Sequence, residues 1–218
     1  MNQYTKIILV RHGQSLGNAT KTILGHTDLD MSEHGFKQAE ATAEYLKNQK
    51  IDVIYSSDLK RAVNTALPHA NMRGLKLHTS EKLREIYVGA WENLKTDDIL
   101  AKWGREIFEN DWLGNFGTFT FPEGESTLEG GRRFYTEMER ICREYPGKTV
   151  LVAAHAAVIR SFWGIISNIS PENLAKELSF STNASFSIAN YDGNRFIPVE
   201  YSHDEHLKEV GITSVKLI

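Results

Sequence analysis

The chain has 218 residues, which is enough for one sizeable domain with a buried core or for two small ones. Its net charge of −3 argues against a general binder of nucleic acid or of anionic membranes, because such proteins carry a basic surface excess. A single cysteine, Cys142, excludes an intramolecular disulfide and a metal cluster built on cysteines.

Export and membrane patterns are also missing from the sequence. The N-terminus lacks a basic stretch followed by a long apolar run, and no window holds the about 18 apolar residues of a membrane span. We therefore expect a cytoplasmic protein that uses neither nucleic acid nor a membrane as a partner.

The first predicted element is a strand at residues 7–10, four consecutive apolar residues of which three are β-branched. Such a run is typical of a strand buried on both faces. Arg11, His12 and Gly13 follow directly, and open α/β sheets bind ligands at the carboxyl ends of their strands. The segment therefore indicates an anion site that contains a nucleophile or base, unless it is an ordinary loop with an Arg-His pair.

Two helices and a second strand are predicted next. Ser32 is a suitable cap for a helix, and the second strand covers 51–55. Asp58 is expected to cap another helix from 59 to about 70, which places Arg61 in the first helical turn near the strand end. The apolar face of the first helix would comprise Phe36, Ala39, Ala43 and Leu46.

The middle of the chain is less regular. A third strand is expected at 75–79, and Glu85 then lies in sequence among Leu83, Ile86, Val88 and Trp91. Residues 97–112 have a helical, aromatic-rich pattern, and a loop follows at 114–124. We interpret 93–123 as a cap or lid inserted over a site.

The last third of the chain contains another apolar strand that ends on a histidine. Ser126 and Glu129 form a capping-box pattern for a helix that runs to about 145. The strand at 149–154 leads directly into His155. Further predicted elements are a helix at 156–168 and two hairpin strands at 185–190 and 195–201. This alternation of strands and helices predicts one domain over 1–218, a three-layer α/β/α sandwich around a mostly parallel sheet.

His12, His155 and Arg61 should meet, because the carboxyl ends of parallel strands lie at one edge of a sheet. Together with Arg11 they suit a phosphoryl dianion, since arginines bind its oxygens and a histidine nitrogen can attack phosphorus. Glu85 could protonate the leaving group, because apolar surroundings favour the neutral form of a carboxyl group.

Structural roles remain open for each of these residues. A histidine at a strand end is often only hydrogen-bonded, Arg61 could be a surface cation, and Glu85 could face solvent. The two histidines could also bind a metal, but neither has a carboxylate at a short ligand spacing.

The residue pattern as a whole resembles the histidine phosphatase superfamily, the phosphoglycerate mutase-like proteins. Five segments match that family in order along most of the chain. They are Arg11-His12-Gly13 with Gln14, Ser15 and Asn18; Tyr55 to Ala62 with Arg61; Leu83-Arg84-Glu85 with Gly89, Trp91 and Glu92; Gly124-Glu125-Ser126 with Arg133; and residues 150–155.

The resemblance implies the phosphoglycerate mutase-like fold and a set of roles. His12 would be the nucleophile that forms a phosphohistidine, and Glu85 the general acid and later the base. The phosphoryl group would be held by Arg11, His12, Arg61 and His155, with help from Asn18 and the backbone of Ala156. No metal and no organic cofactor is implied. The chain departs from the family pattern at two positions. The family usually has glycine where this chain has Ala156, and glycine permits a closer approach of phosphate to the backbone. The family's mutases have tryptophan where this chain has Gly17.

Hydrolysis is favoured over phosphoryl transfer between substrates. The mutases carry a long basic insertion that excludes water, whereas residues 93–122 are aromatic and hold only Lys95, Lys102 and Arg105 as cations. We therefore predict a metal-independent phosphomonoesterase of the histidine acid phosphatase type, acting on a small phosphorylated metabolite whose leaving group is partly apolar or only modestly charged. A cofactor-dependent phosphoglycerate mutase and a non-catalytic phospho-ligand binding protein are the alternatives, and a homodimer stays open.

Overall fold

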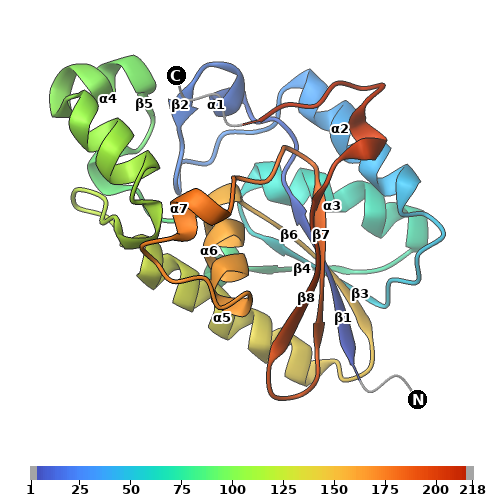
Figure 1. The fold of residues 1–218 in the computed structure, drawn as a ribbon. Coiled ribbons are helices and arrows are strands. Elements are labelled where there is room, and N and C mark those ends of the chain that lie inside the picture. The colour runs from blue at the N-terminus through green and yellow to red at the C-terminus, as the bar shows by residue number, and fades with distance from the viewer. Residues whose placement is uncertain (1–3, 215–218) are drawn as a thin grey trace.

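The computed structural model describes residues 4–214, and its centre is a six-stranded sheet (Figure 1). The strands are β1 (Thr5–Arg11), β3 (Val53–Ser57), β4 (Leu77–Ser80), β6 (Thr149–Ala154), β7 (Phe186–Tyr191) and β8 (Phe196–His203). They lie in the order β4-β3-β6-β1-β7-β8. The first four are parallel, while β7 is antiparallel to β1 and β8 to β7. The predicted mostly parallel sheet is confirmed.

Helices cover both faces of this sheet. The long ones are α2 (Glu33–Tyr45), α3 (Lys60–Arg73), α5 (Thr127–Glu144) and α6 (Ala156–Ile166). Strand β1 shows the reason, because its side chains alternate between two apolar clusters. Ile8 and Val10 join the cluster under α2 and α3, whereas Ile7 and Leu9 join the cluster under α5 and α6. The three-layer α/β/α sandwich predicted from the sequence is therefore confirmed.

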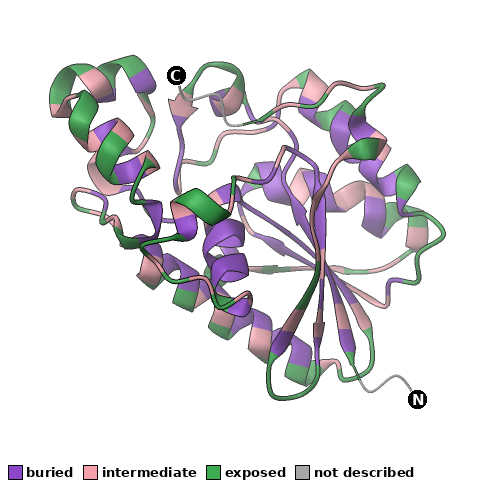
Figure 2. Cartoon of the chain, in the orientation of Figure 1, coloured by how far each residue is buried: buried purple, intermediate pink, exposed green. Residues whose placement is uncertain are grey.

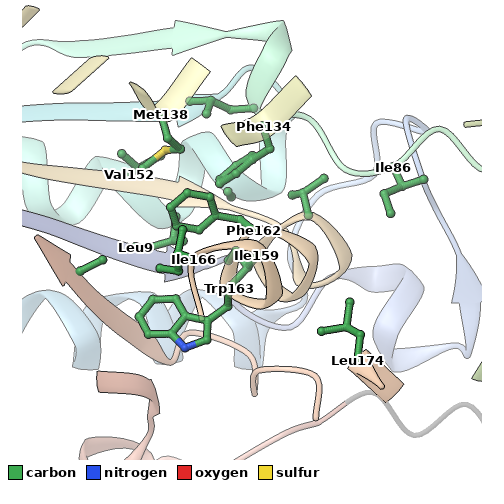
Figure 3. Packing of buried hydrophobic residues seen from close by; sticks show 14 of the residues in the cluster. Leu9, Ile86, Phe134, Met138, Val152, Ile159, Phe162, Trp163, Ile166 and Leu174 are labelled. Carbon is green, nitrogen blue, oxygen red and sulfur yellow. The ribbon is translucent and has the colours of Figure 1, made fainter. Parts of the chain in front are cut away.

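The cluster beneath α5 and α6 is the larger of the two. Figure 3 shows Phe134 of α5 and Phe162 of α6 facing Leu9 and Val152 of the sheet. The two phenyl rings meet edge to face with centroids 5.6 Å apart. In Figure 2 the buried side of each long helix faces the sheet and the exposed side faces outward. This packing fixes α6, whose first residue follows His155, against the sheet.

The remaining helices and strands are short. They are α1 (Leu16–Ala19), β2 (Thr22–Ile23), η1 (Glu81–Leu83), η2 (Gly89–Trp91), β5 (Leu94–Lys95), α4 (Thr96–Trp103), the π-helical η3 (Glu106–Leu113), η4 (Phe116–Thr118), α7 (Leu174–Glu177) and η5 (Glu205–Leu207). β2 and β5 form a separate two-stranded sheet. Within residues 4–214, no helix combines the length and the apolar character needed to cross a membrane.

Residues 93–123 contain α4 and η3 where the sequence predicts a helix at 97–112, and the short η4 within the predicted loop. Their aromatic side chains pack around the fully buried Trp91. The Trp91 ring lies 5.4 Å from the ring of Trp112, 5.4 Å from that of Phe121 and 5.9 Å from that of Phe108, between centroids. These rings belong to the larger core cluster, so the segment is anchored to the main body by its own side chains.

Two local predictions are wrong. Asp58 does not cap α3: its carboxylate pairs with Arg84, and the first helical amide, that of Lys60, donates to Asp28 at 2.7 Å. The capping carboxylate comes from a residue far away in sequence, which local patterns cannot show. Phe36 is exposed on α2 rather than part of its apolar face. Ser32 caps α2 as predicted.

Candidate active site

The site forms where β1, β3 and β6 end side by side. Arg11 of β1 pairs in register with Ala154 of β6, so the residues that follow them, His12 and His155, emerge together. Their ring centroids are 5.2 Å apart. Arg61, in the first turn of α3, donates from Nε to Nδ1 of His155 at 3.3 Å. The predicted convergence of these groups at one sheet edge is observed.

Hydrogen bonds give the two histidines opposite roles. Nδ1 of His12 lies 2.7 Å from the carbonyl oxygen of Gly13, and because a carbonyl only accepts, this nitrogen carries the proton. The Nε2 atom of His12 then has a free lone pair. Nδ1 of His155 accepts from Arg61, so its Nε2 carries the proton. That Nε2 is buried and has no partner among the described residues. One ring can attack and the other can donate.

Burial and charge keep both rings neutral. Desolvation by burial, followed by the nearby Arg61 and Arg11, lowers the pKa of His12 well below its usual value. Burial and Arg61 lower the pKa of His155 in the same way. A neutral imidazole is the nucleophilic form, so His12 is ready to react at neutral pH without first losing a proton.

The two arginines place positive charge beside these rings. Their side chains are only 1% and 2% exposed. Arg11 donates to the carbonyl of Ser181, and Arg61 donates to the carbonyls of Gly25 at 2.7 Å and Thr27 at 2.8 Å. Burial lowers the pKa of each guanidinium to about 10, so both remain charged at pH 7. Carbonyls are neutral, so none of these bonds is an ion pair, and Glu85 is the main acidic group that acts on both guanidiniums. Two buried cations that form no ion pair among the described residues can bind an anion.

Gly13 allows the close turn after His12. A Cβ atom at this position would lie 2.4 Å from the carbonyl oxygen of Gly35, which is closer than atoms can approach. The amide of Gly13 donates to Thr65 Oγ1 at 3.0 Å, which ties the turn to α3. The glycine of the Arg-His-Gly motif is thus required by the backbone of α2.

Glu85 reaches the same pocket but in different surroundings from those expected. Its Oε2 accepts from the amide of Ala157 and its Oε1 from that of Val158, each at 3.0 Å, in the first turn of α6. The amide of Ile86 also donates to Oε1, at 2.9 Å. The expected wholly apolar setting is wrong, because three backbone amides donate to the Glu85 carboxyl group. These amides fix the position of the carboxyl group at the start of α6.

Asn18 and Ala156 line the pocket as the sequence predicts. Oδ1 of Asn18 accepts from the amide of Ser15 at 3.1 Å and from Nδ2 of Asn183 at 3.0 Å. This engages the oxygen and leaves the amino group of Asn18 for a ligand. The amide of Ala156 is the first of α6, and it precedes the two amides that Glu85 occupies. A first-turn amide can bind an anion.

Other residues at the site were not found from the sequence. Asn183 is buried behind the pocket, in an irregular stretch before β7, and its Nδ2 donates to the carbonyl oxygen of His12 at 3.2 Å. The excess of serine and asparagine at 179–187 was the only available signal. The opposite end of the pocket has an apolar wall, composed of Ile23, Leu24, Ile86, Val88, Trp112, Phe121 and Phe180.

Within residues 4–214, no three His, Cys, Asp or Glu side chains gather as a group that could hold a metal ion.

Comparisons with known proteins agree with this geometry. Residues 7–204 match the histidine phosphatase superfamily (branch 1). Phosphoserine phosphatase 1 of Hydrogenobacter thermophilus is 30% identical over 98% of this chain and 99% of its own length. Phosphoglycerate mutase-like protein 4 of Arabidopsis thaliana is 33% identical over 95% of this chain and 89% of its own.

Solved structures resemble the fold closely. A mycobacterial glucosyl-3-phosphoglycerate phosphatase in complex with VO3 superimposes with a TM-score of 0.84, at 25% identity, over 92% of this chain and 100% of its own. YhfR of Bacillus stearothermophilus gives a TM-score of 0.87 at 24% identity, over 94% of this chain and 100% of its own.

Proposed function

Because this chain belongs to branch 1 of the histidine phosphatase superfamily, we propose that it hydrolyses a phosphomonoester through a phosphohistidine formed on His12. One observation carries the proposal. Nε2 of His12 carries a free lone pair and Nε2 of His155 a free proton. Both lie beside two buried arginines that form no ion pair among the described residues. This is the arrangement that a phosphoryl dianion and an in-line nucleophile need.

In the first step, Nε2 of His12 attacks phosphorus and the bond from phosphorus to the ester oxygen breaks. Arg11, Arg61 and the Nε2 proton of His155 bind the non-bridging oxygens, assisted by Asn18 and the amide of Ala156. Glu85 in its acid form gives its proton to the departing alkoxide.

In the second step, Glu85 is the base. Its carboxylate takes a proton from water, whose oxygen attacks phosphorus and breaks the bond to His12. Inorganic phosphate leaves, and Nε2 of His12 regains its lone pair. Glu85 ends the cycle protonated, as it began.

Water is proposed as the phosphoryl acceptor because the pocket has few cationic side chains to bind a second anionic group of a substrate. Among the described residues, the only arginines or lysines that line the pocket are Arg11 and Arg61, and both are used on the phosphoryl group. A phosphoglycerate mutase must also hold the carboxylate of its substrate. In the single domain that we propose for 1–218, residues 93–123 act as a cap that contributes Trp112 and Phe121 to the apolar wall.

The relatives' names support a small phosphorylated metabolite as substrate. One is named a phosphoserine phosphatase and another a glucosyl-3-phosphoglycerate phosphatase. Within that class, the apolar wall favours an ester whose alcohol carries an apolar group. An activity of the histidine acid phosphatase type, independent of added metal, is part of the proposal.

The test is release of inorganic phosphate from p-nitrophenyl phosphate in the presence of EDTA. We expect turnover by the wild-type protein and none by His12→Ala. Absence of turnover with every phosphomonoester, combined with tight binding of phosphate, would instead identify a non-catalytic binding protein. Conversion of 3-phosphoglycerate in the presence of 2,3-bisphosphoglycerate, faster than its hydrolysis, would identify a mutase.

A further inference from the structure

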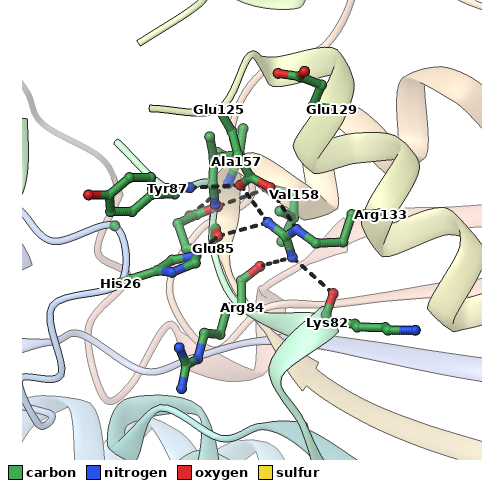
Figure 4. A network of polar contacts seen from close by, with 12 residues as sticks. His26, Lys82, Arg84, Glu85, Tyr87, Glu125, Glu129, Arg133, Ala157 and Val158 are labelled. Atoms are coloured by element: carbon green, nitrogen blue, oxygen red, sulfur yellow. Dashed lines mark hydrogen bonds and ion pairs between the residues drawn. The ribbon is translucent and has the colours of Figure 1, made fainter. Parts of the chain in front are cut away.

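Glu85 lies on a segment that has no helix or strand of its own. Residues 84–88 connect η1 to η2, so their backbone groups lack the regular bonds of secondary structure. Side chains from other parts of the molecule bind them instead, as Figure 4 shows. His26 Nε2 donates to the carbonyl of Glu85 at 2.8 Å, and the amide of Val88 donates to Glu92 at 3.3 Å. A general acid carried by such a segment depends on these side chains for its position.

Arg133 of α5 supplies two further bonds to this segment and a third to Lys82, just before it. A guanidinium has five N–H groups, and all five are used here. Nη1 donates to the carbonyls of Lys82 at 2.9 Å and Arg84 at 3.0 Å, and Nη2 donates to the carbonyl of Glu85 at 3.0 Å. Nε and Nη2 also grip the carboxylate of Glu125, at 2.9 and 2.8 Å. One side chain therefore binds three carbonyls around the acid.

Glu125 completes the arrangement from the other side of Glu85. Its Oε2 accepts from the amide of Tyr87 at 2.9 Å, and its own amide donates to the carbonyl of Tyr87 at 2.8 Å. Burial would raise the pKa of Glu125, but the hydrogen bonds from Arg133 and Tyr87 outweigh it and lower the pKa. Glu125 is therefore a carboxylate at neutral pH and keeps Arg133 oriented.

We infer that Arg133 and Glu125 are a positioning pair that holds the carboxyl group of Glu85 at the leaving-group oxygen. The inference rests on the proposed function, in which Glu85 donates the proton. The pair touches only the backbone around Glu85, whereas the Glu85 carboxylate rests on the α6 amides of Ala157 and Val158. Loss of the pair lets the backbone move while the phosphoryl end, built on strand ends, stays in place.

The test compares two leaving groups. An alkoxide needs a proton in order to leave, and p-nitrophenolate hardly does. The quantity compared is kcat/KM, which covers the steps up to phosphohistidine formation and therefore reports Glu85 as the acid and not as the base. For Arg133→Met we expect kcat/KM on ethyl phosphate to fall about 30- to 100-fold, because a misplacement of about 1 Å costs about that much. On p-nitrophenyl phosphate kcat/KM should fall less than about fivefold. Arg133→Lys should restore little, because a lysine has three donors in place of five.

Glu85→Gln is the reference variant and should show the same split between substrates. If Arg133 acts through Glu85, the double variant should lose no more activity on ethyl phosphate than Glu85→Gln alone. Glu125→Gln is a milder second variant that keeps the shape of the pair, and it should show a smaller split in the same direction.

Arg140→Met is the matched control. Arg140 also lies on α5 and also grips a carboxylate, that of Glu137 at 2.9 and 3.0 Å, but it does not touch the segment around Glu85. It should retain activity on both substrates.

The outcomes separate this inference from the proposed function. If the wild-type protein releases phosphate from neither ester, the proposed function is wrong. If Glu85→Gln shows no split, the acid is misassigned and the positioning role falls with it, while hydrolysis through His12 still stands. If Glu85→Gln shows the split but Arg133→Met and Glu125→Gln lose activity equally on both esters, or none at all, only the positioning role is overturned.

Discussion

The two ends of the pocket are built in different ways. At the phosphoryl end, His12 and His155 each follow the last residue of a parallel strand, and Arg61 is in the first turn of a helix that follows a third. The strand register places them, and burial keeps them rigid. At the leaving-group end, the residues come from irregular segments held by side-chain contacts, such as those of Arg133. The chemistry is therefore fixed by the sheet, while the substrate is selected by parts of the chain that can vary independently of it.

The largest effect should come from His12, the residue on which the phosphoryl end depends. For His12→Ala we expect turnover of every phosphomonoester to fall below detection, because no other described group offers a free imidazole lone pair to phosphorus. Phosphate release measures this. The free energy of unfolding should change by less than about 1 kcal/mol, since little apolar surface is removed. Activity within tenfold of the wild type would remove His12 as nucleophile. His78→Ala, on β4 and outside the pocket, is the control.

The next effect concerns the two buried cations. Arg11→Ala and Arg61→Ala should each lower kcat by about two to four orders of magnitude, since each removes a preorganised donor to the phosphoryl oxygens. Lysine should rescue poorly, because a point charge lacks the planar fork of a guanidinium. Steady-state kinetics on p-nitrophenyl phosphate measures both. Nearly full activity of the lysine variants would contradict the forked contact. Arg73→Ala, on the same helix α3 as Arg61, should keep wild-type kcat.

A smaller effect is expected at the leaving-group end. Phe180 is part of the apolar wall, and the guanidinium of the buried Arg160 lies 4.3 Å behind its ring. Phe180→Ala removes apolar surface and opens a path to that cation. The ratio of kcat/KM for 1-naphthyl phosphate to that for phosphoserine should fall by about tenfold, equivalent to about 1.4 kcal/mol.

Phe180→Leu is the matched control for this change, because leucine keeps the wall apolar and Arg160 covered. Its ratio should stay close to that of the wild type. A preference of the wild-type protein for phosphoserine over 1-naphthyl phosphate would mean that the wall does not select the leaving group.

The smallest effect concerns the pH dependence of stability and not activity, and it comes from a buried histidine outside the pocket. His69 of α3 is fully buried, and both of its ring nitrogens lack a partner among the described residues. Burial, with Arg73 adding to it, lowers its pKa to about 3. The folded pKa lies below the unfolded value of about 6.5, so this group's contribution to stability is complete above pH 6.5 and is lost as pH falls toward 3.

His69→Leu removes that dependence. Between pH 7 and pH 5 the variant should lose about 2 kcal/mol less stability than the wild type, as measured by urea unfolding at each pH. Its kcat should be unchanged. Equal losses in the two proteins would mean that His69 is not held neutral by the fold.

The phosphoryl end of the pocket could be predicted from the sequence much better than the leaving-group end. The apolar runs at β1 and β6 and the residues directly after them predict the phosphoryl end, because strand ends of a parallel sheet must meet. The side of the chain to which Glu85 points could not be predicted, since no periodicity governs an irregular segment. The cap of α3 by Asp28 and the approach of Asn183 to His12 are contacts between distant residues, and local patterns carry no signal for them.

The central claim is that the phosphoryl group passes through His12. The direct measurement is rapid quench of the protein with p-nitrophenyl phosphate into alkali, in which phosphohistidine survives, followed by peptide mass spectrometry. We expect phosphate on the peptide that contains His12, formed in a burst with p-nitrophenol, and a larger amount in Glu85→Gln, because that variant lacks the base for the second step. Turnover without any phosphopeptide, or phosphate found on His155, would contradict the account.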